Sequence, residues 1–337
     1  MNWMPRVDAR AVLPSVLVLV LALALVLVGC SSTGGKPREE DGAGGSVNVN
    51  LPRHVIAMIG HWNPSDAFVD ILRKGATQGA ETNNIDLRYS SDPQPDRQAT
   101  LVQNAIDTKV DAIALDLANP EALIDVSKKA VAAGIPVVAF NSGYDDWKRA
   151  GALMYIGQDE TIAGTAAGER FKELGVKKVL CVVHEQGVPA LDKRCNGVES
   201  GFGGATDRMY LNGFDMSSAR STIEAKLAED PAIDAVITLN ASYAMTALPV
   251  TKAAGRPITV ATFDTNPPLM TAIKDGDVAY AVDQQPWLQG YQAVDTLANY
   301  LNNRSILGGG QPILTGPAFI DKANIDQIAS YAQKGVR

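Results

Sequence analysis

The chain has 337 residues, with 30 basic and 37 acidic side chains and a formal net charge of −7 at neutral pH. This acidic balance excludes the basic surface stripe that nucleic-acid binding normally needs. The three histidines (His54, His61 and His184) lack helical metal-ligand spacing, and neither a phosphate loop nor a dinucleotide fingerprint is present, so we expect no metal and no cofactor.

The first 29 residues have the pattern of an export signal. Arg6 and Arg10 precede an almost wholly apolar run, residues 11–29, which ends at Cys30. The sequence Leu-Val-Gly-Cys at this point resembles the bacterial lipobox, which implies that Cys30 carries lipid and becomes the mature N-terminus. The alternative is an uncleaved membrane anchor, because the apolar run is nearly long enough to span a bilayer. In both cases we expect the folded part outside the cytoplasm.

The rest of the chain predicts a tether followed by an α/β fold. Residues 30–53 are rich in glycine, proline and charge and predict a flexible tether. From His54 onward, apolar runs alternate with amphipathic stretches, the pattern of parallel strands connected by helices. The predicted strands are Val55–Gly60, Ile85–Tyr89, Ala112–Leu115, Val137–Phe140, Leu153–Gly157, Val179–Val183, Met209–Leu211, Val236–Leu239, Thr259–Phe263 and Val278–Val282. The predicted helices are Ala67–Thr82, Arg97–Asp107, Pro120–Ala133, Thr161–Leu174, Ala219–Glu229, Ala241–Ala254 and Trp287–Leu301. The length of this part favours two lobes.

Four of the apolar runs end on a carboxylate or an amide, namely Asp116, Asn141, Asn240 and Asp264. Ligands of open α/β sheets bind beyond the carboxyl ends of the strands, so these groups predict a crevice for a polar ligand. The alternative for any one of them is a residue that ends a strand or caps the next helix.

Two cysteines follow the candidate lipid site. Cys181 lies in an apolar run and Cys195 follows the next loop. A strand and the start of its own helix approach closely, so a disulfide is permitted outside the cytoplasm. The alternative is one buried inert thiol and one thiol in a loop.

Several motifs, taken in order, resemble the ribose-binding-protein branch of periplasmic binding proteins, the solute receptors of ABC importers. They are Asp66-Ala67-Phe68 with Lys74-Gly75-Ala76, Ala133 to Val138, Arg194 with Gly197, Asn240 before Ala241, Phe263-Asp264, and Gln284 before Pro286. The resemblance implies a type I fold of two Rossmann-like lobes with parallel sheets and a three-segment hinge near Gly157-Gln158, Gln285 and Thr315. It implies one lobe from residues 54–157 with 286–314 and another from 158–285 with 315–337. It also implies a monomer that docks on a membrane permease.

The resemblance also implies a set of ligand contacts. These are Ala67, Phe68, Asp116, Asn141, Ser142, Arg194, Phe214, Asn240, Asp264 and Gln284. Further candidates are Asp66 and two aromatic residues, Trp62 and Trp287, of which Trp62 could replace the ring that the family carries at the position of Ala67. Carboxylates and amides would bond vicinal hydroxyls, Arg194 would offer a planar set of donors, and the aromatic rings would cover the C–H face of a sugar. The set departs from ribose binders, which carry an Asp-Arg pair where this chain has Asn141-Ser142 and an amide where it has Asp116. We therefore expect another monosaccharide or a sugar alcohol.

Two further classes of function remain at this stage. The same fold serves receptors that present a loaded ligand, such as a furanosyl autoinducer, to a sensor protein. An extracellular glycoside hydrolase would need Asp116 and Asp264 as a catalytic pair, but Arg194 and the amides are expected to keep both carboxylates ionised, which leaves no general acid. We therefore expect a binding protein and not an enzyme.

Overall fold

The computed structural model describes residues 51–62, 66–213 and 215–337, and the following account concerns those residues. The predicted export signal, Cys30 and most of the tether lie outside them, as does Phe214. Within the described ranges, no helix combines the length and the apolar character that crossing a bilayer requires.

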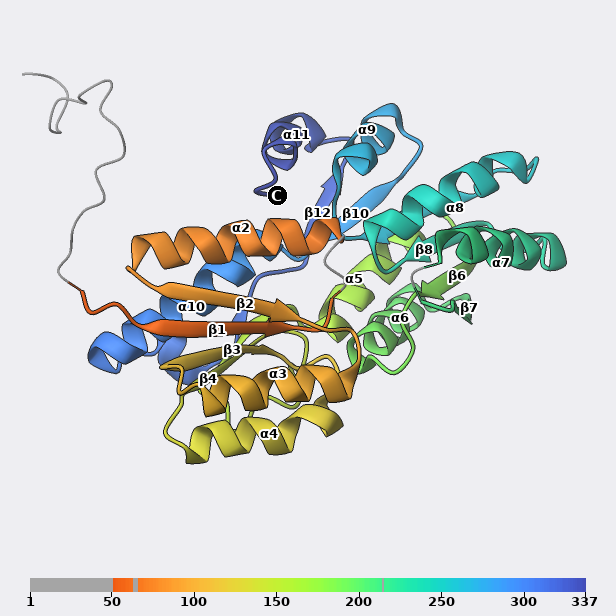
Figure 1. Cartoon of the computed structure of the whole chain (residues 1–337). Coiled ribbons are helices and arrows are strands. Elements are labelled where there is room, and N and C mark those ends of the chain that lie inside the picture. The colour runs from red at the N-terminus through yellow and green to blue at the C-terminus, as the bar shows by residue number, and fades with distance from the viewer. Residues whose placement is uncertain (1–50, 63–65, 214) are drawn as a thin grey trace, which may run out of the picture. The chain divides into compact units, whose positions relative to one another are not determined.

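The first lobe is built on a parallel sheet whose four inner strands are buried apolar runs, while its two edge strands are partly exposed. Its strand order is β11 (Ile313–Leu314), β5 (Tyr155–Gly157), β4 (Val137–Asn141), β3 (Ala112–Asp116), β1 (Val55–Gly60) and β2 (Asp86–Ser91). Four helices belong to this lobe: α2 (Ala67–Thr82), α3 (Pro95–Asp107), α4 (Pro120–Ala132) and α10 (Pro286–Asn303). Helices α2 and α10 pack on one face and α3 and α4 on the other, each pair over its own apolar cluster (Figure 1).

The second lobe repeats this plan. Its sheet has the order β12 (Ala318–Asp321), β10 (Tyr280–Asp283), β9 (Thr259–Phe263), β8 (Ala235–Thr238), β6 (Lys178–Val183) and β7 (Ala205–Tyr210). Its helices are α5 (Glu160–Glu173), α6 (Pro189–Phe202), α7 (Met216–Glu229), α8 (Ala241–Ala253), α9 (Pro267–Asp275) and α11 (Ile325–Gln333). Helices α5 and α6 cover one face of the sheet, and the others cover the opposite face. Two α/β lobes with mostly parallel sheets confirm the predicted fold class.

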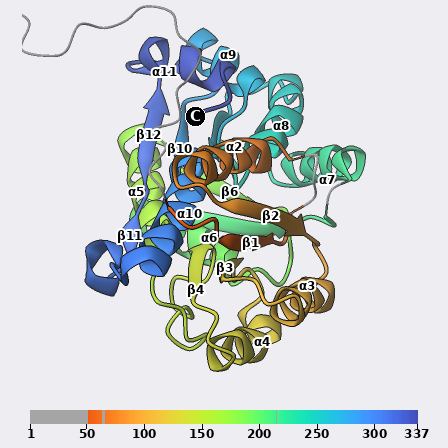
Figure 2. The same ribbon diagram turned by 60° about the vertical axis from the view of Figure 1, so that its left-hand side comes forward.

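The chain passes between the sheets three times: after β5, between β10 and α10, and between β11 and β12 (Figure 2). Hydrogen bonds join these passages to one another. The Thr315 amide donates to the Gly157 carbonyl at 2.7 Å, and its hydroxyl donates to the Gln284 carbonyl at 2.7 Å. The three passages therefore lie side by side at one edge of the molecule.

The structure differs from the predicted elements mainly at the edges of the sheets. Strand β12 runs antiparallel to β10, so the expectation of purely parallel sheets is wrong there. Strands β11 and β12 and helices α6, α9 and α11 are not among the predicted ranges; all of these except α6 are short and lack a long apolar run. Strand β7 begins at Ala205 instead of Met209, since an edge strand keeps one side in water and needs no continuous apolar sequence. A short 3-10 helix, η1 (Leu307–Gly310), follows α10.

Candidate functional site

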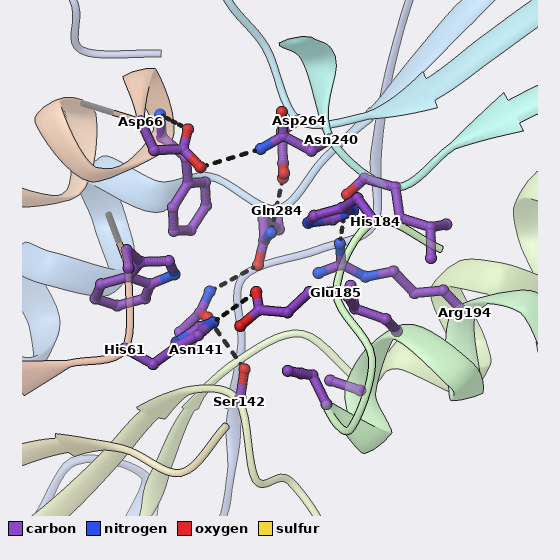
Figure 3. Close-up of a pocket in the computed structure, with 16 residues that line it drawn as sticks. His61, Asp66, Asn141, Ser142, His184, Glu185, Arg194, Asn240, Asp264 and Gln284 are labelled. Carbon is purple, nitrogen blue, oxygen red and sulfur yellow. Dashed lines mark hydrogen bonds and ion pairs between the residues drawn. The ribbon is translucent and has the colours of Figure 1, made fainter. Parts of the chain in front are cut away.

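A polar cavity of about 500 Å³, its open mouth included, lies where the carboxyl ends of the strands of both sheets face one another. Residues of the two lobes enter it from opposite sides (Figure 3). Its lining consists of His61, Trp62, Asp66, Phe68, Asn141, Ser142, His184, Glu185, Val188, Ala190, Leu191, Arg194, Leu239, Asn240, Asp264 and Gln284. Nine of the eleven candidate contacts named above with a polar or aromatic side chain, from Trp62 to Gln284, are in this lining, and Asp116 is not. Phe214 lies outside the described residues.

Asp116 is fully buried beneath the cavity and does not line it. One carboxylate oxygen accepts from the Ser142 amide at 3.1 Å, and the other is hydrogen-bonded to Nδ1 of His61. The predicted role of Asp116 as a ligand contact is therefore corrected: it orients His61, which takes the place in the cavity. The strand-end pattern located Asp116 but could not show that a residue 55 positions earlier covers it.

His61 faces a carboxylate from the other lobe. Its Nε2 lies 3.7 Å from Oε2 of Glu185. Burial alone would lower the pKa of His61, but the carboxylates of Asp116 and Glu185 outweigh burial and raise it to about 10. Burial alone would raise the pKa of Glu185, but the hydrogen bond and the charge of His61 outweigh burial and lower it. A charged pair therefore spans the cavity between the lobes.

His184 and Glu185 were not among the predicted contacts, although a signal for them was present. They directly follow the strand β6, which ends at Val183, so the strand-end argument applies to them as it does to Asn141 or Asn240. Burial lowers the pKa of His184 to about 4, which keeps its ring neutral at pH 7. Its buried Nδ1 has no hydrogen-bond partner among the described residues, so it is available to a ligand.

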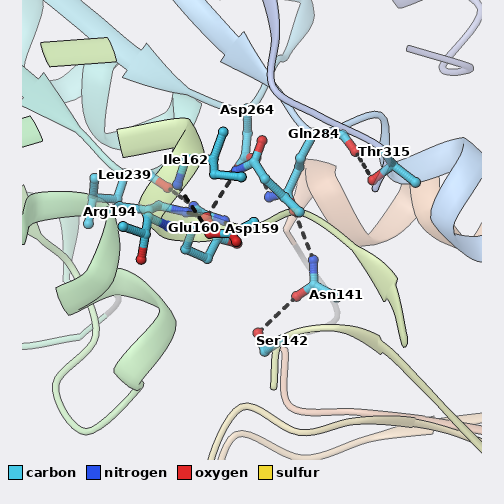
Figure 4. Close-up of polar contacts among 12 residues, drawn as sticks. Asn141, Ser142, Asp159, Glu160, Ile162, Arg194, Leu239, Asp264, Gln284 and Thr315 are labelled. Carbon is cyan, nitrogen blue, oxygen red and sulfur yellow. Dashed lines mark hydrogen bonds and ion pairs between the residues drawn. The ribbon is translucent and has the colours of Figure 1, made fainter. Parts of the chain in front are cut away.

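Arg194 lines the cavity, but much of its guanidinium is already engaged (Figure 4). Nε and Nη2 donate to the two carboxylate oxygens of Glu160 at 2.5 and 3.0 Å, and Nη1 donates to the Leu239 carbonyl at 3.1 Å. Both partners of the ion pair are about 95% buried. Only the N–H groups of Arg194 that do not bond Glu160 or Leu239 remain for a ligand. Glu160, which holds the guanidinium, was not among the predicted site residues.

A chain of side-chain hydrogen bonds connects the two lobes through the second passage of the chain. Asn141 donates to the Gln284 side-chain oxygen at 3.1 Å, and Gln284 donates to the Asp264 carboxylate at 2.7 Å (Figure 4). Asn141 and Asp264 both have positive φ values, 60° and 64°, which Asn and Asp tolerate better than most residues. Burial raises the pKa of Asp264 to about 7, against the opposing effects of Arg194 and Gln284. The expectation that Asp264 stays fully ionised at neutral pH is therefore wrong.

Asp66 and Asn240 cap helices and also meet across the cavity. Asp66 caps α2 by accepting from the Phe68 amide at 3.0 Å, and Asn240 caps α8 by accepting from the Ser242 amide at 2.8 Å. The Asn240 amide then donates to the second carboxylate oxygen of Asp66 at 3.3 Å. The helix-cap interpretation therefore applies to these residues, which also line the cavity.

Aromatic rings form the apolar side of the cavity. The rings of Trp62 and Phe68 lie 5.8 Å apart and are tilted, and Trp62 also packs on Phe140. A side chain on Gly60 would overlap the Trp62 ring, so glycine at this position lets the indole lie across the end of β1. One wall thus offers ring faces, while the other walls offer charged and amide groups.

Comparison with known proteins gives a consistent result. Residues 56–305 match the family described as periplasmic binding protein domain. The chain is 26% identical to the xylose/arabinose-binding protein XylF of Sulfolobus acidocaldarius, over 88% of this chain and 78% of that protein. It is also 26% identical to the ribose import binding protein RbsB of Bacillus subtilis, over 72% and 80% of the two chains. A solved structure of a carbohydrate transporter from Acidothermus cellulolyticus 11B, in complex with myo-inositol, is 50% identical, with a TM-score of 0.83 over 85% of this chain and all of the other.

Proposed function

The chain belongs to the periplasmic binding protein domain family, and from this premise we propose that it is a lipoprotein that captures a monosaccharide or polyol outside the cytoplasm. It would deliver the captured molecule to the permease of an ABC transporter.

The observation that carries this proposal is the composition of the cavity walls. Both lobes contribute hydrogen-bonding side chains to one space, and the Trp62 and Phe68 rings cover one side of it. A molecule with hydroxyls around a ring and C–H groups on its faces matches this arrangement, because hydroxyls both donate and accept while ring faces bury apolar surface. Acceptors on Asp66, Glu185 and Asp264 form the charge-assisted bonds, which are the stronger ones.

Within this class, a cyclic polyol is the first candidate. The 50% identical carbohydrate transporter was solved with myo-inositol. A cyclitol has no ring oxygen, so every polar group on it can donate a hydrogen bond. The lining contains three carboxyl groups, on Asp66, Glu185 and Asp264, that can accept such bonds, and this favours such a ligand over a pentose.

The contacts across the cavity support capture by closure. His61 faces Glu185, Asn240 is bonded to Asp66, and Lys193 of the second lobe is paired with Asp145 of the first. A ligand that contacts both lobes adds interactions that only the closed form makes, and it therefore shifts the equilibrium toward closure. We assign residues 54–157 with 286–314 to one lobe, 158–285 with 315–337 to the other, and the hinge to the three passages.

We infer that the protein is a receptor and not a hydrolase. A glycosidase needs two carboxyl groups on either side of the scissile bond. Of the candidate pair, Asp264 faces the cavity, but Asp116 is covered by His61. The other carboxylates of the lining are engaged, Glu185 with His61 and Asp66 with the start of α2 and with Asn240.

Ligand titration tests the proposal. We expect myo-inositol, or another member of a panel with xylose, arabinose, ribose and allose, to raise the melting temperature of the purified protein. Asn240→Asp should abolish much of that shift, because it keeps the cap of α8 but places a second carboxylate opposite Asp66. Asn266→Asp is the matched control, since Asn266 caps α9 in the same way and does not line the cavity. If no sugar or polyol at millimolar concentration raises the melting temperature, the proposal fails.

The lipid anchor is tested separately. Cys30→Ala should move the protein from the membrane fraction to the soluble envelope fraction. Unchanged membrane association would favour an uncleaved anchor.

A further inference from the structure

The two remaining cysteines form a disulfide that closes a short segment next to the cavity. Cys181 lies in β6 and Cys195 in α6, 14 positions later, with their Cα atoms 5.9 Å apart. Both side chains are fully buried. The bond therefore joins the middle of a strand to the helix that follows it.

The segment between the cysteines carries a large share of the cavity wall. Six of the sixteen lining residues belong to it: His184, Glu185, Val188, Ala190, Leu191 and Arg194. The other lining residues of the second lobe follow single strands. This segment alone supplies a cation, an anion, a neutral imidazole and the adjacent apolar contacts, so its placement determines much of the site.

Few other bonds hold the turn between β6 and α6. In the described part of the chain, its side-chain hydrogen bond to the rest of the second lobe is a long one, from Gln186 Nε2 to the Leu211 carbonyl at 3.4 Å. His184 packs on the Tyr243 ring at 4.8 Å between centroids, and its Nδ1 is without a partner. Helix α6 begins at Pro189 without a side-chain cap. The disulfide is therefore the covalent link across this turn, whereas Arg194, near its far end, is held separately by Glu160 and Leu239.

We propose that the Cys181–Cys195 disulfide positions one wall of the ligand site, by holding the turn between β6 and α6 so that His184 and Glu185 face the ligand. The site then reaches its full affinity only after the chain has entered an oxidising compartment. This inference rests on the proposed function for the nature of the ligand.

The chemistry that forms the bond is thiol–disulfide exchange. One cysteine, as the thiolate, attacks a disulfide oxidant, and a mixed disulfide forms as the first oxidant thiol leaves. The second cysteine then attacks the mixed disulfide, and the second oxidant thiol leaves. The two cysteines lose two electrons and two protons, and the oxidant's disulfide becomes two thiols. In a reducing cytoplasm the exchange runs the other way, so the segment is unconstrained before export.

A first measurement tests the positioning without any ligand. The full-length lipoprotein in detergent is compared with the same protein unfolded, reduced and refolded in reducing buffer, because buried sulfurs are closed to reductant in the folded state. We expect faster amide hydrogen exchange in residues 184–191 of the reduced protein, with unchanged exchange in β9 and in the first lobe. Equal exchange in both forms, or a uniform increase over the second lobe, would overturn the proposal.

A second measurement tests the effect on binding. Cys181→Ala, Cys195→Ala and the double variant should each bind myo-inositol, or the panel member that raises the melting temperature most, roughly tenfold more weakly, because each change removes the same bond and its preorganisation. Ile273→Ala is the control, since it removes buried volume from the second lobe around α9 and should reduce stability while leaving affinity unchanged. Reoxidation of the reduced wild-type chain should restore its affinity.

The outcomes separate this inference from the proposed function. If the single losses add in the double variant, or if all forms bind equally, the disulfide acts by packing alone and the inference is wrong. If no form binds any sugar or polyol, the proposed function fails, and the hydrogen-exchange comparison still decides whether the bond positions the segment.

Discussion

At the scale of single residues, the cavity depends on side chains that neutralise or orient those in contact with the ligand. Glu160 holds Arg194, and Asp116 holds His61. A buried charge that loses its partner is costly, because the low-dielectric surroundings cannot solvate it. The supporting residues should therefore affect stability as strongly as the contacts affect binding.

Glu160→Gln tests this for the buried pair. We expect a loss of about 3–5 kcal/mol in the free energy of unfolding, because the Arg194 guanidinium keeps its charge without a counterion. Glu121→Gln is the control, since Glu121 pairs with Arg149 on the surface, and we expect a change within about 0.5 kcal/mol. Urea denaturation measures both. Equal effects of the two substitutions would show that burial of the first pair has no energetic consequence.

Asp264 links ligand binding to proton release. Its raised pKa of about 7 means that the folded protein binds a proton there more readily than the unfolded chain, so this group costs stability as the pH rises from about 4 to about 7. Ligand hydroxyls that donate to the carboxylate would lower the pKa again. We therefore expect binding at pH 6.5 to release between about half and one proton per ligand, with affinity rising toward pH 8.

Calorimetry in buffers of different ionisation enthalpy measures this release. Asp264→Asn should abolish the release and flatten the pH dependence of affinity. Binding by the wild-type protein without proton release would mean that Asp264 is already ionised in the free site.

At the scale of elements, each lobe brings one pair of helices into close contact through glycines. In the first lobe, a side chain on Gly75 or Gly290 would overlap the backbone of α10 or α2. In the second, a side chain on Gly164 or Gly201 would overlap the backbone of α6 or α5. Because Glu160 is on α5 and Arg194 is on α6, the spacing between these helices also sets the geometry of the buried ion pair.

Gly164→Ala tests this coupling. A Cβ there collides with the Arg194 carbonyl oxygen, so we expect a net loss of about 1–3 kcal/mol in stability and a weaker affinity for the ligand. The gain in helix propensity, up to about 1 kcal/mol, opposes but does not cancel this loss. Glu169→Ala on the exposed side of α5 should leave both quantities nearly unchanged. Chemical denaturation and calorimetry report them, and a Gly164→Ala protein with wild-type affinity would show that helix spacing does not set the site.

At the scale of the whole molecule, the sequence was sufficient for the two-lobed architecture because buried parallel strands leave uninterrupted apolar runs. The strand ends located Asn141, Asn240 and Asp264 for the same reason. The sequence could not show that His61 covers Asp116 or that Glu160 engages Arg194, since those contacts join residues 55 and 34 positions apart. Whether the polar residue at a strand end faces the cavity depends on how distant segments of the chain pack over it. The periodicity of apolar residues does not report that packing.

We expect the charged pair of His61 with Glu185, one residue from each lobe, to favour closure. Its pKa shifts define the pH window in which it acts. His61 has a raised pKa, so its stabilisation is fully present below its ordinary value of 6.5 and is lost as the pH rises through about 10. Glu185 has a lowered pKa, so its stabilisation is present above its ordinary value of 4.5 and is lost in more acidic solution. Because Asp116 lies in the same lobe as His61 and raises its pKa in either form, only the attraction to Glu185 favours closure, and it acts while both groups are charged.

Fluorescence transfer between dyes placed on the two lobes tests this in the absence of ligand. We expect the closed population of the wild-type protein to fall as the pH rises from 7 to 10, because loss of the His61 proton removes the attraction to Glu185. Glu185→Gln should lower the closed population at pH 7 and remove its alkaline decline. Asp145→Asn is the control, since Asp145 also bridges the lobes but is about half exposed in its pair with Lys193, where an ion pair contributes little. A closed population that does not change with pH, or that responds equally to both substitutions, would show that closure rests on the ligand and the hinge and not on this pair.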